Sequence, residues 1–237
     1  MPKGYIMSDI ILRYVGTALD ESGVMASIDN LEGEDLTGAD LSETDLSKVS
    51  FKGCNLSGAS LSGSKVDGAC FDGAVMKGAN LENVKGIKVS FVGTNLDRAD
   101  FNGCDLEDAD MQEASMRGVI ADEGIFVDSD MSRANLSGAD FTGANLQGVQ
   151  FDDSNLKRTN LHMALLNNAN LNGADLTDAK LHKADLTDCI VSGIKLDGAD
   201  LCDVNIQGTH LTEEQQKMVS DQRSVKGIFG VIKNIFK

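Results

Sequence analysis

The sequence predicts an all-β solenoid built from one short unit that is repeated along most of the chain. Three observations support this prediction. A large apolar residue recurs at every fifth position from Leu31 to Leu211, glycine is abundant in the same frame, and the only proline is Pro2. A period of five fits neither the 3.6-residue turn of an α-helix nor the two-residue alternation of a plain strand. It fits a short extended segment followed by a turn.

The repeat unit is clearest in residues 134–148, which read ANLSG, ADFTG, ANLQG. Of the 37 frame positions, 35 hold Leu, Phe, Met, Val or Ile, and the exceptions are Gly86 and Ala121. Side chains two residues apart share one face of an extended segment. The small residue two positions before each apolar residue is therefore expected to point inward, as the apolar residue does. The Asp or Asn between these two residues is expected to point outward. The glycine slot suits a turn that needs a positive φ.

This pattern resembles the A(D/N)LXX consensus of the pentapeptide-repeat proteins. In that family four units make one square coil of 20 residues, and the coils stack as a right-handed quadrilateral β-helix. The resemblance covers residues 31–211 and implies about nine coils and a rod about 44 Å long at the spacing of paired strands. In general layout the chain resembles the quinolone-resistance members. The expected fold class is therefore all-β, with short helical caps at the N- and C-terminal ends.

Residues 20 apart should lie directly above one another if four units make one coil. Phe51, Phe71 and Phe91 are then expected to form one inner column. Gly86 and Ala121 should each leave a gap in the interior, which bulging could fill by turning Ile87 or Ile120 inward. Two interpretations remain open for these irregular units: a kink in the coil, or a contact surface that projects from the rod.

The segments outside the repeat are predicted to cap its two ends. Residues 1–30 form an N-terminal helical cap, in which Ser8 begins a helix with one apolar face. Residues 212–237 form a C-terminal cap and amphipathic tail. Thr212 and Gln215 read as a capping box for a helix of about residues 213–222. The tail is a candidate dimer contact, a candidate membrane contact or a disordered segment, and its apolar stripe comprises Val225, Ile228, Phe229, Ile232, Ile235 and Phe236.

The net charge of −16 resides in the repeat, because residues 31–211 hold 30 acidic and 14 basic residues. Such acidity disfavours direct nucleic-acid binding and favours a basic protein partner. The most acidic stretch runs from residue 97 to residue 130. It is either ordinary solvated surface or a partner-binding patch, and its acids are Asp97, Asp100, Asp105, Glu107, Asp108, Asp110, Glu113, Asp122, Glu123, Asp128 and Asp130.

Three functional hypotheses follow. The first is a non-enzymatic interaction or scaffold protein that presents a rigid acidic rod. The second is a DNA mimic that binds DNA gyrase or another type II topoisomerase and changes quinolone sensitivity, as the resemblance implies. The rod would carry roughly 0.36 negative charges per Å against roughly 0.6 for duplex DNA, a density that permits mimicry without requiring it. The third is a peripheral membrane protein anchored by residues 224–237.

Catalysis, cofactors and metals find little support in the sequence. The chain has no phosphate-binding loop, no GxSxG motif and no Cys pair with metal-ligand spacing. His162 and His182 are expected to stack, but no third ligand follows at a defined spacing, so no metal site is assigned. Cys54, Cys104 and Cys189 occupy the small inward slot and are interpreted as core residues. With no visible signal peptide, a cytoplasmic, reducing location is expected.

Overall fold

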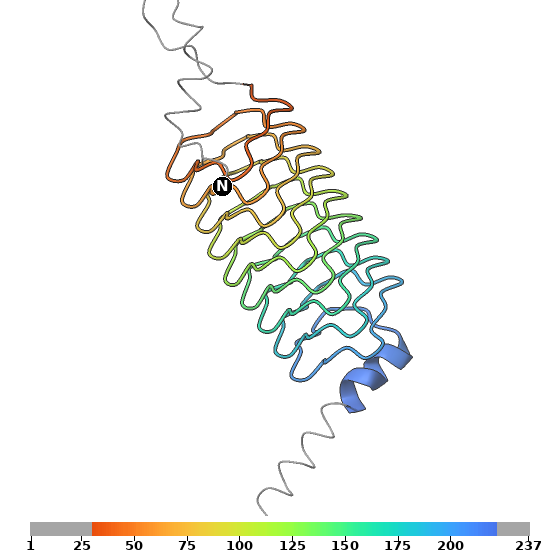
Figure 1. Ribbon diagram of the computed structural model, residues 1–237. Coiled ribbons are helices and arrows are strands. Elements are labelled where there is room, and N and C mark those ends of the chain that lie inside the picture. Colours follow the sequence, from red (N-terminus) through yellow and green to blue (C-terminus); the bar gives the residue numbers. More distant parts are fainter. Residues whose placement is uncertain (1–29, 222–237) are drawn as a thin grey trace, which may run out of the picture.

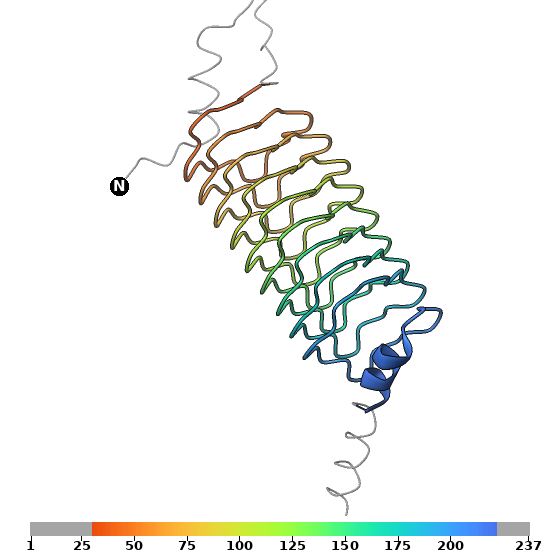
Figure 2. The same cartoon turned by 90° about the vertical axis from the view of Figure 1, so that its right-hand side faces the viewer.

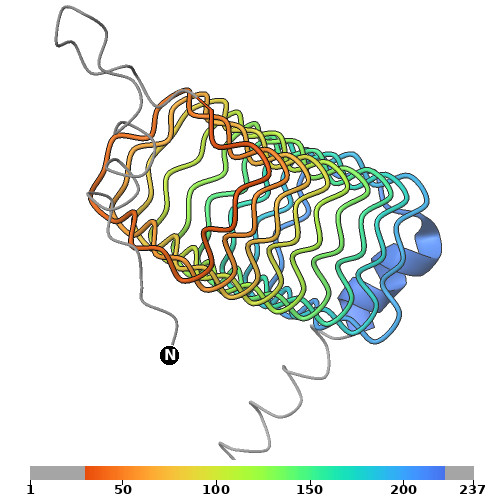
Figure 3. The same cartoon turned by 45° about the horizontal axis from the view of Figure 1, so that its top comes forward.

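The computed structural model describes residues 30–221, which form a straight rod of stacked coils closed at one end by a helix (Figure 1, Figure 2). Each coil has four turns and surrounds one central core, and Figure 3 shows the successive coils stacked one on another. The fold is a right-handed quadrilateral β-helix, which confirms the predicted fold class. The predicted N-terminal helix in residues 1–30 and the apolar stripe of the tail lie outside the described residues, apart from Asn30.

The register is 20 residues throughout the rod. Its β-structure consists of single bridge residues, one in each extended segment, at every fifth position from Asn30 to Asn205. All of these bridges are parallel, and each joins a residue to the one 20 positions later, such as Asp110 to Asp130. Backbone hydrogen bonds therefore run along the rod, and each coil bonds to the coil before it and the coil after it. This pairing fixes the height of one coil at about 4.8 Å.

The interior follows the five-residue pattern of the sequence. The apolar frame residues and the small residues two positions before them form one continuous core, and most are completely buried. Phe51, Phe71 and Phe91 stack as predicted, with ring centroids 4.8 and 5.0 Å apart and nearly parallel planes. Identical rings can stack here because each is carried at the same point of consecutive coils.

Every side of the coil ends in the same turn. In most turns the amide of the fourth residue donates to the carbonyl of the first, as Ala139 does to Leu136 at 3.0 Å, whereas the amides of Thr44 and Ala109 donate to a serine hydroxyl of the next coil. The third residue of the turn recurs at every fifth position from Gly33 to Gly208, 36 times in all. Its φ is positive in every case, although only 18 of these residues are glycine. A positive φ at this position defines a type II turn. The predicted turn geometry is confirmed, although glycine supplies only half of the positions.

The outward Asp or Asn before each apolar residue has a structural task. Its Oδ1 accepts a hydrogen bond from the backbone amide two residues on, as Asn135 accepts from Ser137 at 3.2 Å and Asp130 from Ser132 at 2.9 Å. Aspartate and asparagine commonly make this bond at turns. Ten of the 30 acidic residues in the repeat make this bond, so turn formation explains about a third of its acidity before any partner is considered.

Phe126 fills the space that Ala121 leaves. Phe101 and Phe141 belong to the column of Ala121, one coil before and one coil after it, whereas Phe126 belongs to the next column. Its ring nevertheless lies edge-on to both, with centroids 6.1 Å from Phe101 and 5.7 Å from Phe141. Gly124 makes room for it, because a Cβ there would lie 2.8 Å from Cε2 of Phe126. The expected gap is absent.

The gap expected at Gly86 is also absent. A Cβ at Gly86 would lie 2.7 Å from Cγ2 of Val66 and 2.8 Å from Cγ2 of Val89, so these two valines have closed over the glycine. Ile87 and Ile120 do not turn inward, since they are 52% and 47% exposed. The expectation that Ile87 or Ile120 fills the core was wrong, because buried inward-facing neighbours fill it instead.

The C-terminal helix covers residues 213–221 and closes the end of the rod (Figure 1). The predicted capping box is present: the amide of Thr212 donates to Oε1 of Gln215 at 2.9 Å, and the amide of Gln215 donates to Oγ1 of Thr212 at 3.3 Å. Gln215 also donates to the carbonyl of Ile194 in the last coil. Val219 is buried against the core. The helix thus shields apolar side chains that the last coil would otherwise expose.

Candidate interaction surface

Four edges run along the rod, and each is a column of turns that recur every 20 residues. In chain order we call them the first edge (32–33, 52–53 and onward), the second edge (37–38, 57–58), the third edge (42–43, 62–63) and the fourth edge (47–48, 67–68). A flat side lies between each pair of neighbouring edges. Side chains at the edges point away from the core, so the edges carry most of the exposed charge.

The structure distributes the predicted acidic patch around the whole rod. Glu113 lies on the first edge and Asp97 on the second, while Asp110 and Asp130 lie on the side between the fourth edge and the first. Asp100 is on the side before the third edge, where it accepts the amide of Asn102. A stretch that is continuous in sequence therefore does not form one surface.

Six of the predicted acids do share one surface, on two adjacent coils. We call it the acidic face; it spans the third edge, the fourth edge and the side between them, and comprises Asp105, Glu107, Asp108, Asp122, Glu123 and Asp128. Five of the six are exposed and Asp105 is half-buried. Ile125 and Val127 lie among them and are partly exposed. No basic side chain occurs on these two coils within the face, and the nearest bases on the preceding coil are Lys85, which stacks on Asp105, and Lys88, which stacks on Asp108.

The second edge is the exception to the acidity of the rod. It holds five basic residues and three acids; the bases are Lys77, Arg98, Arg117, Lys157 and Arg158, and the acids are Asp97, Asp178 and Asp197. The fourth edge, diagonally opposite, has five acids and two bases. Its acids are Asp67, Glu107, Asp108, Asp128 and Asp188, and its bases are Lys48 and Lys88. The charge of the rod is therefore strongly asymmetric around its axis.

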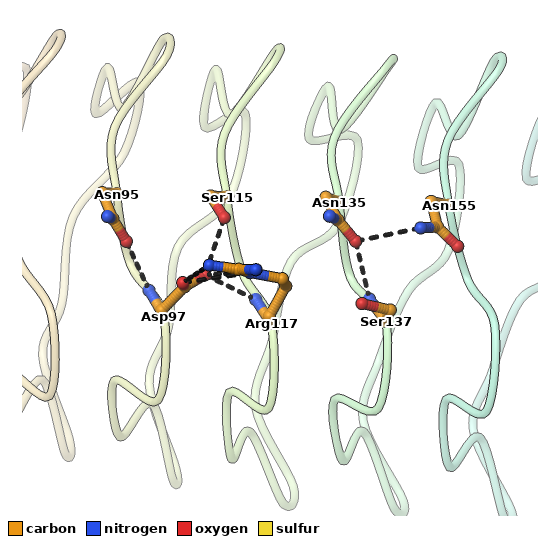
Figure 4. A network of polar contacts seen from close by, with 7 residues as sticks. All are labelled: Asn95, Asp97, Ser115, Arg117, Asn135, Ser137 and Asn155. Carbon is orange, nitrogen blue, oxygen red and sulfur yellow. Dashed lines mark hydrogen bonds and ion pairs between the residues drawn. The ribbon is translucent and has the colours of Figure 1, made fainter.

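Asp97 is withdrawn from solvent by its partners on the second edge (Figure 4). Its side chain is 7% exposed and is ion-paired with Arg117, while Ser115 donates to Oδ1 at 2.6 Å. Burial acts to raise the pKa of Asp97, but the hydrogen bonds from Arg117 and Ser115 outweigh it and lower that pKa. Asp97 joins two coils and contributes little to a binding surface, in contrast to its predicted place in the patch.

The buried cysteines are core residues, as predicted. Cys54, Cys104 and Cys189 lie in the small inward slot, and the thiols of Cys54 and Cys189 donate to carbonyls of the preceding coil. Burial raises the pKa of the Cys104 thiol and raises that of Cys189 to about 12. A thiol that stays protonated is a poor nucleophile, so these residues stabilise the coil rather than react.

His162 and His182 stack as predicted, with parallel rings whose centroids are 5.1 Å apart. Sequence reasoning assigned no third ligand near them, and the structure places Asp200 and Cys202 beside His182. Asp200 and Cys202 follow His182 by 18 and 20 residues. Because one coil has 20 residues, this spacing could have predicted that they lie beside His182. The candidate dimer or membrane contacts of the tail lie beyond residue 221, outside the part of the chain that the structure describes. No helix within residues 30–221 has the length and apolar character to cross a membrane.

The chain is similar to several solved structures, and the first of those described below supports the fold. A trypsin-treated variant of QnrB1, a plasmid-mediated fluoroquinolone resistance protein, is 18% identical with a TM-score of 0.60 over 81% of this chain and 94% of that one. HetL from the cyanobacterium Nostoc sp. strain PCC 7120 is 23% identical with a TM-score of 0.44, over 88% and 99% of the two chains. A thylakoid-lumen protein of Arabidopsis thaliana is 21% identical with a TM-score of 0.35, over 56% and 74%.

A search of curated proteins finds no match to the chain. The family model described as pentapeptide repeats, by contrast, matches in overlapping copies that together cover residues 35–120 and 126–213. This span contains nearly all of the coils, the uniform turns and the stacked core described above. The chain belongs to the pentapeptide-repeat family.

Proposed function

We propose that this protein is a non-enzymatic interaction or scaffold protein whose acidic face binds a basic macromolecular partner. The observation that supports this most strongly is the acidic face itself. Glu107, Asp108, Asp122, Glu123 and Asp128 are exposed, and none of them accepts the turn hydrogen bond that explains Asp100 or Asp130. Their charge therefore has no structural task within the coil.

The chemistry of the face indicates the kind of partner. Carboxylates surround the partly exposed Ile125 and Val127, and interfaces commonly combine an apolar centre with a charged rim. Ile87 is a further exposed apolar residue on the fourth edge, one coil before Glu107. A partner with Lys or Arg around an apolar patch would be complementary. Because rim charges act mainly on the association rate, binding should weaken as salt rises.

A pair of matched triple variants tests this proposal. The face variant carries Asp108→Asn, Glu123→Gln and Asp128→Asn. The control variant removes the same three charges elsewhere, with Glu43→Gln, Asp153→Asn and Asp188→Asn. All six positions are exposed turn residues with φ between 52° and 56°, so the two variants differ only in where the charge is lost.

Each protein is immobilised and used to capture partners from cell extract at low and high salt, followed by affinity measurement with the purified partner. We expect at least one protein to bind the wild type and the control variant, to be lost from the face variant, and to dissociate at high salt. Identical captured sets on all three proteins would refute the acidic face as a binding surface.

A type II topoisomerase such as gyrase is the second candidate partner. The fold likeness to a fluoroquinolone resistance protein and a charge of roughly 0.36 per Å along the rod support it. The basic second edge is a departure from the uniform field of duplex DNA, so mimicry would not involve that edge. A supercoiling assay with and without a quinolone tests this. We expect inhibition of supercoiling or protection from the quinolone at micromolar protein. The absence of both effects would exclude a type II topoisomerase as the partner.

Two further parts of the proposal concern the tail and the location of the protein. Dimerisation or membrane-surface binding through residues 224–237 stays a prediction from the sequence. Flotation of liposomes with the full chain and with a 1–223 truncation tests the membrane alternative, which equal behaviour would contradict. A cytoplasmic location is proposed because all five cysteines are free thiols, which suits a reducing compartment.

A further inference from the structure

Three side chains with metal-binding atoms meet on the third edge, close to the C-terminal end of the rod. One imidazole nitrogen of His182, one carboxylate oxygen of Asp200 and the thiol sulfur of Cys202 all lie within 4.8 Å of one another. His182 and Cys202 occupy the same turn position in consecutive coils. Asp200 stands two residues before Cys202, on the side that leads into that turn. The cluster therefore joins the eighth coil to the ninth.

The three side chains are held in place by bonds to the turn. The amide of Cys202 donates to Oδ1 of Asp200 at 3.0 Å, which keeps the carboxylate beside the thiol. Nδ1 of His182 lies 3.0 Å from the carbonyl oxygen of Cys202 and 4.0 Å from the carboxylate of Asp203. On the other side, the parallel ring of His162 packs against that of His182. Carboxylates and backbone carbonyls that orient a histidine are usual around metal-binding imidazoles.

The donor set selects the class of ion. One nitrogen, one oxygen and one sulfur suit Zn²⁺, whereas Mg²⁺ and Ca²⁺ prefer oxygen alone. Zinc bonds of 2.0–2.3 Å in a tetrahedron imply about 3.3–3.8 Å between ligand atoms. The present spacing, up to 4.8 Å, is wider than that range, so metal binding would draw the three side chains about 1 Å closer together. Because the cluster is partly open to solvent, water would supply the fourth ligand.

We propose that His182, Asp200 and Cys202 form a binding site for a zinc-type divalent metal ion that ties the last two coils together. The core at this end is less protected than the middle of the rod. Val191 and Ile194 are each 6% exposed and Leu196 is 5% exposed, while the frame residues of the central coils are completely buried. An ion bound only by the folded coils would stabilise them, and it would do so where the stack is weakest.

Cobalt and zinc titrations of the purified, reduced protein test this site. Cobalt is the spectroscopic probe, because a cobalt–thiolate bond gives a charge-transfer absorption band. We expect one Co²⁺ per chain with such a band, displacement of Co²⁺ by Zn²⁺, and a Zn²⁺-dependent rise in Tm. Absence of saturable binding at micromolar metal, or binding without the thiolate band, would overturn the proposal.

Variants assign the ligands. Cys202→Ser should abolish the band, and Asp200→Asn should weaken binding by about tenfold or more while its amide oxygen still accepts the bond from Cys202. Cys70→Ser is the matched control, since Cys70 is also a half-buried free thiol but lies far along the rod. It should bind metal like the wild type. A band that persists in Cys202→Ser, or disappears in Cys70→Ser, would show that the cluster is not the site.

Discussion

The interior and the edges of the rod follow different rules. Interior frame positions hold a narrow set of side chains: 35 of 37 carry a large apolar residue, and most of these residues are fully buried. The turn positions at the edges share one backbone conformation, yet half of the 36 are not glycine and include Arg, Lys, Glu and Asp. The interior therefore determines the coil, while the edges are free to carry the charge that a partner would recognise.

The tolerance of the edges has an energetic cost. A side chain in the left-handed conformation costs about 1 kcal/mol relative to glycine. At these positions the backbone amides bond to the next coil, as those of Asp108 and Asp128 bond to the carbonyls of Val127 and Gln147. The hydrogen bonds between coils thus hold non-glycine residues in a left-handed conformation that they rarely adopt. Charge at the edges is placed there at the expense of stability.

The largest effect is expected where the interior departs from its own rule. Ala121→Leu should destabilise the protein by about 1–3 kcal/mol, because the ring of Phe126 already occupies the space. Phe126→Leu should cost a similar amount by leaving that space empty. The double variant restores the common pattern, so it should be more stable than the sum of the two losses by at least about 1 kcal/mol. Denaturant unfolding of all four proteins measures this, and simple additivity would contradict the packing described.

A smaller effect is expected at a glycine of the second edge. Gly138 has a φ of 69°, and a Cβ there would meet no atom within 4 Å, so only backbone strain opposes a side chain. Gly138→Val should cost about 1–2 kcal/mol, because β-branched residues are disfavoured in this conformation. Gly138→Asn should cost less than half as much, since Asn tolerates it. Thermal unfolding distinguishes the two, and equal losses would show that φ does not govern the edges.

Most of the fold could be predicted from the sequence because the repeat reports the interior directly. The spacing of Phe51, Phe71 and Phe91 was sufficient to predict their stacking, and Thr212 with Gln215 predicted the terminal helix. The fillings at Gly86 and Ala121 could not be predicted. They depend on which neighbouring side chain reaches the gap, and a five-residue frame contains no information about contacts between columns.

The candidate surface was harder to predict for a related reason. A run of acids such as Asp97 to Asp130 is continuous in sequence, but four turns per coil distribute it around the rod. Only positions that differ by about 20, or that flank one side, become neighbours. Applying this rule separates Asp97 from Glu107 and brings Asp200 and Cys202 to His182. What no pattern shows is which acids are already engaged, as Asp97 is with Arg117.

The smallest effect is expected at Asp175, which belongs neither to the apolar interior nor to the exposed edges. Its carboxylate points outward but is bound by several partners. Asp175 accepts bonds from the amide and hydroxyl of Thr177 and pairs with Lys157 and Lys195, each 3.3 Å away. Burial acts to raise the pKa of Asp175, but these hydrogen bonds outweigh it and lower that pKa to about 2. Because the folded-state pKa lies below the unfolded value, the stabilisation is complete above about pH 4 and is lost as pH falls toward 2.

Asp175→Asn keeps an oxygen for Thr177 but removes the charge that faces the two lysines. The wild type should therefore have the higher Tm at pH 7, and the difference should shrink between pH 4 and pH 2 as the wild-type carboxyl becomes protonated. Asp153→Asn at the exposed first edge changes the net charge equally and serves as the control. A difference for Asp175→Asn that stays constant down to pH 2 would mean that the lysines do not stabilise the carboxylate. In that case the outward-facing side chains would contribute to stability only through the turn hydrogen bonds, and their charges would contribute nothing.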